Sequence, residues 1–457
     1  MTAAFTPTDT PSRGRALPGP SRRSALRLLA QMNRDRLAMM TGAAREYGDA
    51  ARLPVGHKAL YFFNHPETAK HVLAGNAANY RKGIGLVHAR RALGDGLLTS
   101  EGELWKEQRK VIQPAFQSRR IAEQAGAVAA EGARLVDRLR SRIGAGPVQL
   151  VDELTGLTLG VLGRTLLDAD LHEFDGIGTD FARVQDQAMF ELETLSMVPM
   201  WIPLPHQMRF RKARQRLEVV VERLVAERRA RRTDADDVLS RLIVSADREA
   251  DPRTGRMRLR DELVTLLLAG HETTASTLSW SLHLLDRHPQ VWQRVHDEAV
   301  EVFGGRAPEY DDLRRLTYTS AVISEAMRLF PPVWLLPRIA IEDDVVGGYR
   351  VPAGADVLVS PYTLHRHPAF WPEPDRFDPE RFLGDAATDR PRFAYIPFGA
   401  GPRFCVGNHL GLLEAVLVLA LLCRDLRLTG LPGRPVVAEP MLSLRIRGGL
   451  PVTVQAA

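Results

Sequence analysis

A single cysteine in a glycine-rich loop, placed directly before a strongly apolar segment, constrains this chain more than any other feature. The loop is Phe398-Gly399-Ala400-Gly401-Pro402-Arg403-Phe404-Cys405-Val406-Gly407, and an apolar helical pattern begins near Asn408. Glycine lets a backbone turn tightly and approach a flat ligand closely. A cysteine at a helix N-terminus lies at the positive end of the helix dipole, which favours the thiolate. A lone cysteine is more often a small buried hydrophobe, so the surrounding glycines are what make this loop a candidate ligand site.

Composition is that of an ordinary globular protein. The 457 residues are 45% hydrophobic and 25% charged, and a chain of this size can bury a large core around a cofactor. Only two cysteines are present, Cys405 and Cys423, so a disulfide framework is excluded and a cytoplasmic location is expected. We interpret Cys423, which lies inside the apolar pattern, as a core residue.

Charge and hydropathy exclude two classes of partner. The net charge is +6, but no basic stripe with interleaved aromatic residues is present, so we expect no nucleic-acid partner. The longest apolar run, 415–423, is much shorter than the roughly 20 residues that a bilayer requires, so we expect no membrane span. Residues 1–24 are rich in Pro, Thr, Ser and Arg and predict a flexible tail before a single domain over 25–457.

Helical periodicity dominates the rest of the chain and predicts a mainly α fold with a small β portion. Small β subregions are expected near 50–64, 344–360 and 441–455, with hairpins centred on Gly347-Gly348 and Gly448-Gly449. The prolines of 197–205 break any helix there, and the apolar residues between them indicate a mobile lid. The clearest predicted helices cover 22–47, 104–116, 209–232, 258–287 and 318–330.

The helix predicted over 258–287 carries a second motif, Ala269-Gly270-His271-Glu272-Thr273-Thr274. An acid followed by a hydroxyl is costly in an apolar helix unless both find partners. Gly270 weakens the helix, and Thr273 can bond back to a carbonyl, so the segment is expected to open a kink that holds water. The plainer alternative is a capped kink without chemistry. We interpret His271 as a packing residue.

Two further constellations place charged residues at helical spacing. Glu325 and Arg328 are three residues apart and can pair on one helix face, and Arg381 in Pro379-Glu380-Arg381-Phe382 supplies a second cation. Trp105 and Arg109 are four residues apart and share one face of another predicted helix.

These motifs, in this order, resemble those of the cytochrome P450 family, and the resemblance covers essentially the whole chain after about residue 40. It implies the cytochrome P450 fold and a heme b whose iron is ligated by the Cys405 thiolate, so Cys405 is also the expected metal ligand. Many soluble bacterial members carry histidine where this chain has Trp105 and Arg403. The cofactor-binding residues that the resemblance implies are Trp105, Arg109, Arg338, Phe398, Gly399, Arg403, Cys405 and Gly407.

The resemblance also implies roles for the other motifs. Thr273 would hydrogen-bond dioxygen during its activation, and Glu272 would relay protons from water, so these two are the expected catalytic residues. Glu325, Arg328 and Arg381 would form a structural network that locks the core near the cysteine loop. If that network is buried, breaking it would cost about 3–5 kcal/mol.

The implied activity is a heme-thiolate monooxygenase that uses dioxygen and oxidises an apolar terpenoid, polyketide or fatty acyl substrate, in secondary metabolism. A diffuse similarity to actinomycete sesquiterpene hydroxylases supports this class. Electrons are expected from a separate ferredoxin and ferredoxin reductase, docking on a basic face that includes Arg119 and Arg424. The expected substrate pocket is apolar. Its predicted members are Leu86, Leu97, Phe190, Leu268, Val333, Trp334, Met441 and Leu442.

Besides a helical scaffold without heme, which a red purified protein would exclude, two rival functions stay open from the sequence. One is a peroxide-driven or isomerising heme-thiolate enzyme, which does not need the proton relay that Glu272 and Thr273 would provide. The other is a heme carrier or gas sensor, which gains nothing from an acid and an alcohol beside the iron. Product formation together with a thiolate-type carbon monoxide spectrum separates the enzyme from the sensor.

Overall fold

The computed structural model describes residues 14–457 except 57, 175, 195, 232–236 and 388. The described chain is mainly helical, with four small sheets, and it divides into two compact units. Unit 1 comprises the described residues up to Ile84 together with Leu335–Pro372 and Pro391–Phe404. Unit 2 comprises Gly85–Trp334, Glu373–Arg390 and Cys405–Ala457. Each unit is described by itself below.

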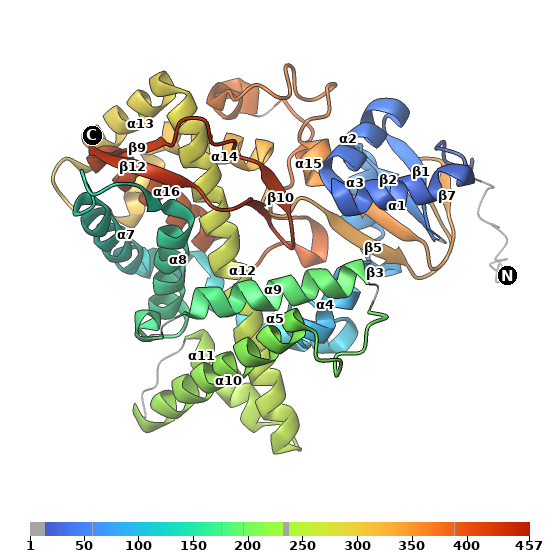
Figure 1. Ribbon diagram of the computed structural model, residues 1–457, viewed down its shortest axis with the longest axis horizontal. Coiled ribbons are helices and arrows are strands. Elements are labelled where there is room, and N and C mark those ends of the chain that lie inside the picture. The colour runs from blue at the N-terminus through green and yellow to red at the C-terminus, as the bar shows by residue number, and fades with distance from the viewer. Residues whose placement is uncertain (1–13, 57, 175, 195, 232–236, 388) are drawn as a thin grey trace, which may run out of the picture. The chain divides into compact units, whose positions relative to one another are not determined.

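Unit 1 is organised around a five-stranded sheet of order β1-β2-β8-β5-β3 (Figure 1). Strands β2 and β8 are parallel, with Leu60 opposite Asp356, and the other pairs are antiparallel. Side chains alternate between two cores, because Phe62 packs in one cluster and its neighbour Phe63 in the other. The strands are β1 Ala50–Val55, β2 Lys58–Phe63, β3 Tyr80–Lys82, β5 Leu336–Ala340 and β8 Asp356–Val359.

The helices of unit 1 are α1 Ala25–Arg34, α2 Arg36–Tyr47, α3 Pro66–Lys70 and α15 Pro361–Leu364. The prediction of one helix over 22–47 is wrong, because Asp35 interrupts the helix and separates α1 from α2. That residue has an extended backbone and caps α2, its carboxylate accepting the N–H of Ala38 at 2.9 Å.

Residues 1–13 of the predicted tail lie outside the described residues, and residues 14–24 contact the rest of unit 1. Leu17 is buried, and the carbonyl of Pro18 accepts the N–H of Arg52 in β1 at 2.7 Å. Arg15 forms a bridge to Tyr349. These contacts hold the described part of the segment against a strand and a hairpin.

The hairpin predicted at Gly347-Gly348 is confirmed. Strands β6 Asp344–Val346 and β7 Tyr349–Val351 pair antiparallel across this turn. Both glycines have positive φ, 59° and 81°, as a two-residue hairpin turn that matches the strand twist requires.

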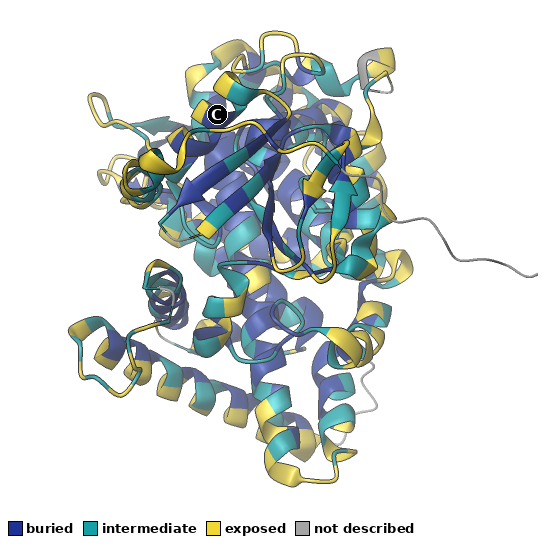
Figure 2. Ribbon diagram, turned by 90° about the vertical axis from the view of Figure 1, so that its right-hand side faces the viewer, coloured by how far each residue is buried: buried dark blue, intermediate teal, exposed yellow. Residues whose placement is uncertain are grey.

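Unit 2 holds the long helices, and α12 (Pro252–Arg287) contacts several of them. Pro252 occupies the first helical position, and the Asp251 carboxylate caps the N–H groups of Arg253 and Thr254, both at 3.1 Å. Most side chains of α12 beyond its first turns are buried (Figure 2). The other helices are α4 Leu86–Leu93, α5 Gly102–Ile112, α6 Ser118–Glu123, α7 Ala125–Arg140, α8 Leu150–Leu166, α9 Ile177–Glu193, α10 Pro205–Arg231, α11 Val238–Asp247, α13 Pro289–Phe303, α14 Thr317–Leu329 and α16 Asn408–Asp425.

The strands of unit 2 form two small sheets, and here the second hairpin prediction is wrong. Strand β11 (Leu444–Ile446) pairs with β10 (Ala438–Pro440), whereas β12 (Pro451–Ala456) lies between β4 (Val148–Gln149) and β9 (Leu426–Gly430). Gly448 and Gly449 do adopt positive φ. The predicted turn at the two glycines is therefore present, but the strands on either side of it belong to different sheets.

Candidate functional site

The Cys405 sulfur lies just before α16, whose N-cap is Gly407. No side chain caps this helix end, and the Gly407 N–H donates to Cys405. The solvent-accessible surface of Cys405 is exposed, yet enough protein surrounds the sulfur for desolvation to raise its pKa. The Gly407 N–H and the positive charge of Arg109 act on the pKa in the opposite direction. The N–H at the helix N-terminus that the sequence suggested is therefore present, Arg109 adds a second anion-stabilising group, and burial outweighs both in the protein alone.

The donor set at Cys405 fits a cofactor that brings most of its own ligands. Among the described residues, no group of three or more His, Cys, Asp or Glu side chains could hold a metal ion. A single exposed thiol beside a cation cannot complete a zinc-type site, which needs about four protein ligands or three with a water. One thiolate is, however, sufficient as the axial ligand of a heme iron.

Arg109 and Trp105 both lie on α5, four residues apart, and both are half-buried. Burial lowers the pKa of the Arg109 guanidinium, and Cys405 raises it, so the two groups are electrostatically coupled. In unit 2 the structure therefore brings Arg109 to the sulfur, as a cation placed to pair with an anionic group bound there.

The motif on α12 coincides with an interruption in the burial of that helix. Ala269 is exposed, and Gly270, Glu272 and Thr273 are half-buried, whereas the residues around them are buried. A side-chain carbon at Gly270 would lie 2.7 Å from the Leu162 side chain, so any larger residue here would have to displace Leu162 on α8. The small residues thus leave one step of a core helix accessible.

Thr273 bonds back to its own helix as the sequence suggested, its Oγ1 donating to the Ala269 carbonyl at 2.8 Å. The α-helix itself runs without interruption through these residues. His271 packs in the core, with Nδ1 2.6 Å from the Leu267 carbonyl and its ring against Phe181.

Glu272 is held by two side chains that sequence reasoning missed. The Ser443 hydroxyl donates to Oε1 of Glu272 at 2.8 Å, and the Gln185 amide donates to Oε2. Gln185 in turn accepts from Arg445 at 3.0 Å. These partners are 171 and 87 residues away from Glu272 in the chain, so no local pattern could have indicated them.

The ion network of Glu325, Arg328 and Arg381 is formed inside unit 2. Arg328 and Glu325 are both fully buried and make a bidentate pair at 2.6 and 2.8 Å. The Nε of Arg381 lies 3.6 Å from Glu325, whose Oε1 also accepts the Asp378 N–H at 2.8 Å. Burial raises the pKa of Glu325, while these cations and N–H groups lower it.

Four of the predicted cofactor-binding residues belong to unit 1. Arg338 lies in β5 and is buried, and Phe398, Gly399 and Arg403 lie in the loop that precedes Cys405. Gly399 has a φ of 71° and Gly401 a φ of 67°. A side-chain carbon at Gly401 would lie 1.9 Å from the Leu73 carbonyl oxygen, so this close approach requires glycine.

The predicted pocket residues are all in unit 2, on segments that meet near α12. Trp334 donates through Nε1 to the Met441 carbonyl at 2.9 Å, and the Leu444 N–H donates to the Pro332 carbonyl at 2.8 Å. These bonds place Val333 beside the turn that contains Leu442 and Ser443, and Ser443 contacts Glu272. Leu268 lies on α12 itself and is buried.

The remaining pocket residues lie on α4, α9 and the loop between α4 and α5. Leu86 begins α4, and α4 packs against α9. Phe190 on α9 packs its ring 4.0 Å from that of His206. Leu97 lies in the loop 94–100, and its N–H donates to Glu262 on α12 at 3.1 Å.

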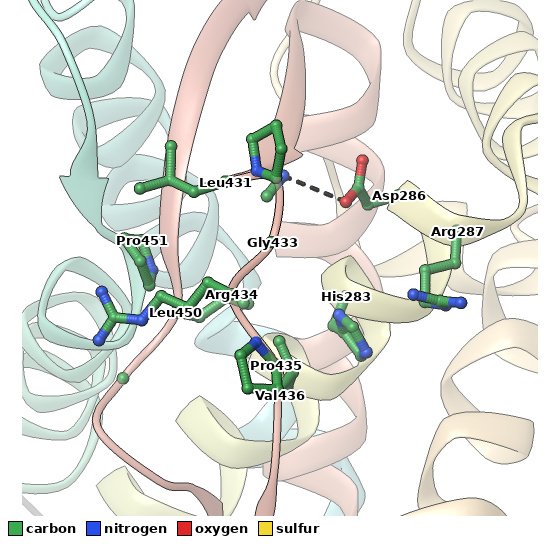
Figure 3. Close-up of a pocket in the computed structure, with 13 residues that line it drawn as sticks. His283, Asp286, Arg287, Leu431, Gly433, Arg434, Pro435, Val436, Leu450 and Pro451 are labelled. Carbon is green, nitrogen blue, oxygen red and sulfur yellow. Dashed lines mark hydrogen bonds between the residues drawn. The ribbon is translucent and has the colours of Figure 1, made fainter.

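A separate surface pocket lies at the other end of α12 and contains none of the predicted site residues (Figure 3). It is lined by His283, Asp286 and Arg287, by 430–436 and by 449–451. The Asp286 carboxylate accepts the Gly430 N–H at 3.1 Å. His283 follows Thr273 by ten residues, which corresponds to about 15 Å along a helix.

Within the described residues, none of the helices is both long enough and apolar enough to cross a lipid bilayer.

Comparisons with known proteins agree over most of the chain. The family model described as Cytochrome P450 matches residues 17–447. Cyclooctatin synthase of Streptomyces melanosporofaciens is 38% identical over 87% of this chain and 87% of its own length. Cyclooctat-9-en-7-ol 5-monooxygenase of the same organism is 38% identical over 85% of this chain and 84% of its own. Pentalenene oxygenase of Streptomyces avermitilis is 32% identical over 89% and 90%.

Proposed function

Because this chain belongs to the cytochrome P450 family and is a heme-thiolate monooxygenase, we propose that it inserts one oxygen atom of dioxygen into an apolar terpenoid in secondary metabolism. The names of the relatives support this class, since they denote an alkene, pentalenene, and an unsaturated alcohol, cyclooctat-9-en-7-ol. The apolar character of the eight predicted pocket residues agrees with a hydrocarbon-like substrate.

The observation that carries the site assignment is the convergence of the Gly407 N–H and the Arg109 charge on the Cys405 sulfur. When bound, the heme supplies a thiolate-ligated iron at which dioxygen is activated. Cys405 would provide the sulfur. Trp105 and Arg109 would hold a propionate from unit 2, and Arg338 and Arg403 are the corresponding candidates in unit 1.

Thr273 and Glu272 are the proposed proton-handling groups. Thr273 Oγ1 donates its hydrogen to the Ala269 carbonyl, so its lone pairs are left to accept a hydrogen bond from water and keep that water ordered. Ser443 and Gln185 donate to the two carboxylate oxygens of Glu272 and so fix its position, and the carboxylate would exchange protons with water. Both residues lie on the half-buried step of α12, where solvent reaches the helix.

We also propose a separate ferredoxin and ferredoxin reductase as electron donors, and action in the cytoplasm. Neither cysteine forms a disulfide, which fits a reducing compartment. Arg119 is 93% exposed and makes only a surface pair with Glu123 at 3.6 Å, whereas Arg424 is mostly covered and pairs with Asp425 at 2.7 Å. Arg119 is therefore the stronger candidate for the docking face.

A binding screen tests the substrate class. The heme-loaded protein is titrated with polycyclic terpene hydrocarbons, their monohydroxylated derivatives, fatty acids and macrolides, and the spectral change caused by displacement of water from the iron is recorded. We expect terpenes to give the tightest response, followed by product formation with ferredoxin, reductase and dioxygen. Tighter binding and turnover of fatty acids or macrolides would overturn the terpenoid assignment, and turnover by peroxide alone would replace the monooxygenase cycle.

A further inference from the structure

A buried acid on α12, Glu262, holds the loop 94–100. Its Oε2 accepts the N–H of Leu97 at 3.1 Å, and its neighbour Asp261 accepts the N–H of Asp95 through Oδ2 at 2.8 Å. Glu262 is 2% exposed. Two consecutive acids of one helix therefore take two backbone donors from one loop, so the loop is tied to the helix through its backbone.

Two glycines allow the loop to lie directly on the helix. A side-chain carbon at Gly94 would lie 2.3 Å from the Asp261 carboxylate, and one at Gly96 would lie 2.0 Å from Thr265 Oγ1 and 2.6 Å from the Asp261 carbonyl oxygen. None of these three distances leaves room for a side-chain carbon unless the neighbouring atoms shift. Any larger residue at Gly96 must lift the loop away from the α12 backbone.

The loop is also held by bonds within it and by bonds to the helices on either side. The Thr99 hydroxyl donates to the Gly94 carbonyl at 2.6 Å, and the Gln108 amide donates to the Asp95 carbonyl at 2.7 Å. Asp95 is paired with Arg90 on α4. The loop is thus tied to α4 and α5 on either side of it, while Asp261, Glu262 and the two glycines hold it against α12.

The chemistry of Glu262 suits a neutral anchor. Burial raises its pKa to about 8, with Asp261 acting in the same direction and the Leu97 N–H in the opposite one. At neutral pH the side chain is therefore mostly a carboxylic acid, which has a proton to donate as well as an oxygen to accept with. Its second oxygen, Oε1, and Thr265 Oγ1 are both buried without a hydrogen-bond partner among the described residues. They are three residues apart, on one face of the helix.

The anchored loop lies on the same face of α12 as Thr273. Glu262, Ala269 and Thr273 recur at intervals of seven and four residues, which places them in one stripe of a helix. Eleven residues separate Glu262 from Thr273, or about 16 Å along the axis. Leu97 is therefore held over the accessible side of α12, towards its N-terminus from Thr273.

We propose that Glu262 is a positioning residue for substrate specificity, which fixes the height of the Leu97 loop above α12 and so the size of ligand accepted beside Thr273. The assignment of Leu97 to the pocket rests on the proposed function. The anchor itself rests only on the contacts above. In this proposal Glu262 acts through the loop that it holds.

Hydrogen exchange tests the anchor without any assumption about the substrate. In Glu262→Ala, the rate of amide exchange in 94–100 should rise about tenfold, because the loss of one buried hydrogen bond raises the equilibrium constant for opening the loop by about that factor. The rate of exchange in α7 should be unchanged. Glu262→Gln keeps an oxygen for the Leu97 N–H and should exchange as the wild type does. Gly96→Ala leaves Glu262 intact but lifts the loop, so it should reproduce the effect of Glu262→Ala. Unchanged exchange of 94–100 in both Glu262→Ala and Gly96→Ala would overturn the proposal.

Specificity is then measured with a series of imidazoles carrying substituents of increasing size, whose nitrogen binds the heme iron and shifts its spectrum. The ratio of Kd for the largest imidazole to Kd for the smallest should fall about tenfold in Glu262→Ala. The same ratio should stay at the wild-type value in Glu262→Gln. Leu135→Ala in α7, a buried truncation outside the loop, controls for lost stability and should leave the size dependence intact. A size dependence that is equal in wild type and Glu262→Ala would overturn the specificity role. Absence of terpene binding to a wild type that binds the imidazoles normally would instead count against the proposed substrate class alone.

Discussion

At Cys405 two polar neighbours and the bulk of the protein act in opposite directions on the pKa of the thiol. The Gly407 N–H and Arg109 favour the thiolate, and desolvation favours the thiol. A coordinating cation reverses this balance, since a metal-bound thiol loses its proton outright. The residue is therefore set up to become an anion when a cation binds, and to remain neutral otherwise.

Thr273 is the residue whose loss should separate electron use from product formation. Thr273→Ala removes the hydroxyl that orders water on the accessible step of α12, so we expect about tenfold less product per electron consumed and a matching rise in hydrogen peroxide. The measurement is the ratio of product formed to the electron donor oxidised by the reductase. Thr277→Ala is the matched control, because Thr277 makes the same bond one turn further on, to the Thr273 carbonyl at 2.9 Å, and is buried. Equal coupling in Thr273→Ala and wild type would remove the relay role.

At the scale of single elements, α12 illustrates what the sequence could and could not predict. Its apolar periodicity and its stop near residue 287 were visible, and so was the unusual acid–alcohol pair at 272–273. The partners of Glu272 could not be predicted, because Gln185 and Ser443 approach it only in the tertiary fold. The failed predictions have the same cause. A cap at Asp35 divided one predicted helix, and the strands beside Gly448-Gly449 found separate partners in different sheets.

The pairing of α14 with the segment 373–382 should carry a large share of the stability of unit 2. Glu325→Ala leaves the fully buried Arg328 without its counter-ion, so we expect a loss of about 3–5 kcal/mol in the free energy of unfolding and poor heme retention. Urea denaturation of the holoprotein measures it. Arg294→Ala removes a half-exposed partner of Glu380 and should change stability little. A Glu325→Ala protein as stable as Arg294→Ala would show that the buried pair does not lock this region.

At the scale of the whole molecule, residues of one short motif are distributed over both compact units. The cysteine loop belongs to unit 1 as far as Phe404, and Cys405 begins the last segment of unit 2. A motif read along the sequence thus identifies chemistry correctly without defining a structural unit. The basic excess of +6 is likewise a property of the whole chain, and it favours association with an acidic partner.

Turnover supported by an acidic ferredoxin should therefore fall as salt rises, since screening weakens attraction between exposed charges. We expect the apparent KM for ferredoxin to rise several-fold between low and physiological ionic strength, with kcat less affected. Arg119→Glu should raise the KM at low salt and reduce the salt dependence. A flat salt profile in the wild type would remove the basic docking face.

The most direct test of the whole account is the carbon monoxide difference spectrum of the reduced holoprotein, recorded for wild type, Cys405→Ser and Cys423→Ser. Cys423 is buried inside α16 and serves as the matched control. We predict the thiolate-type band in the wild type and in Cys423→Ser, and its complete loss in Cys405→Ser. A band that survives in Cys405→Ser would contradict the account.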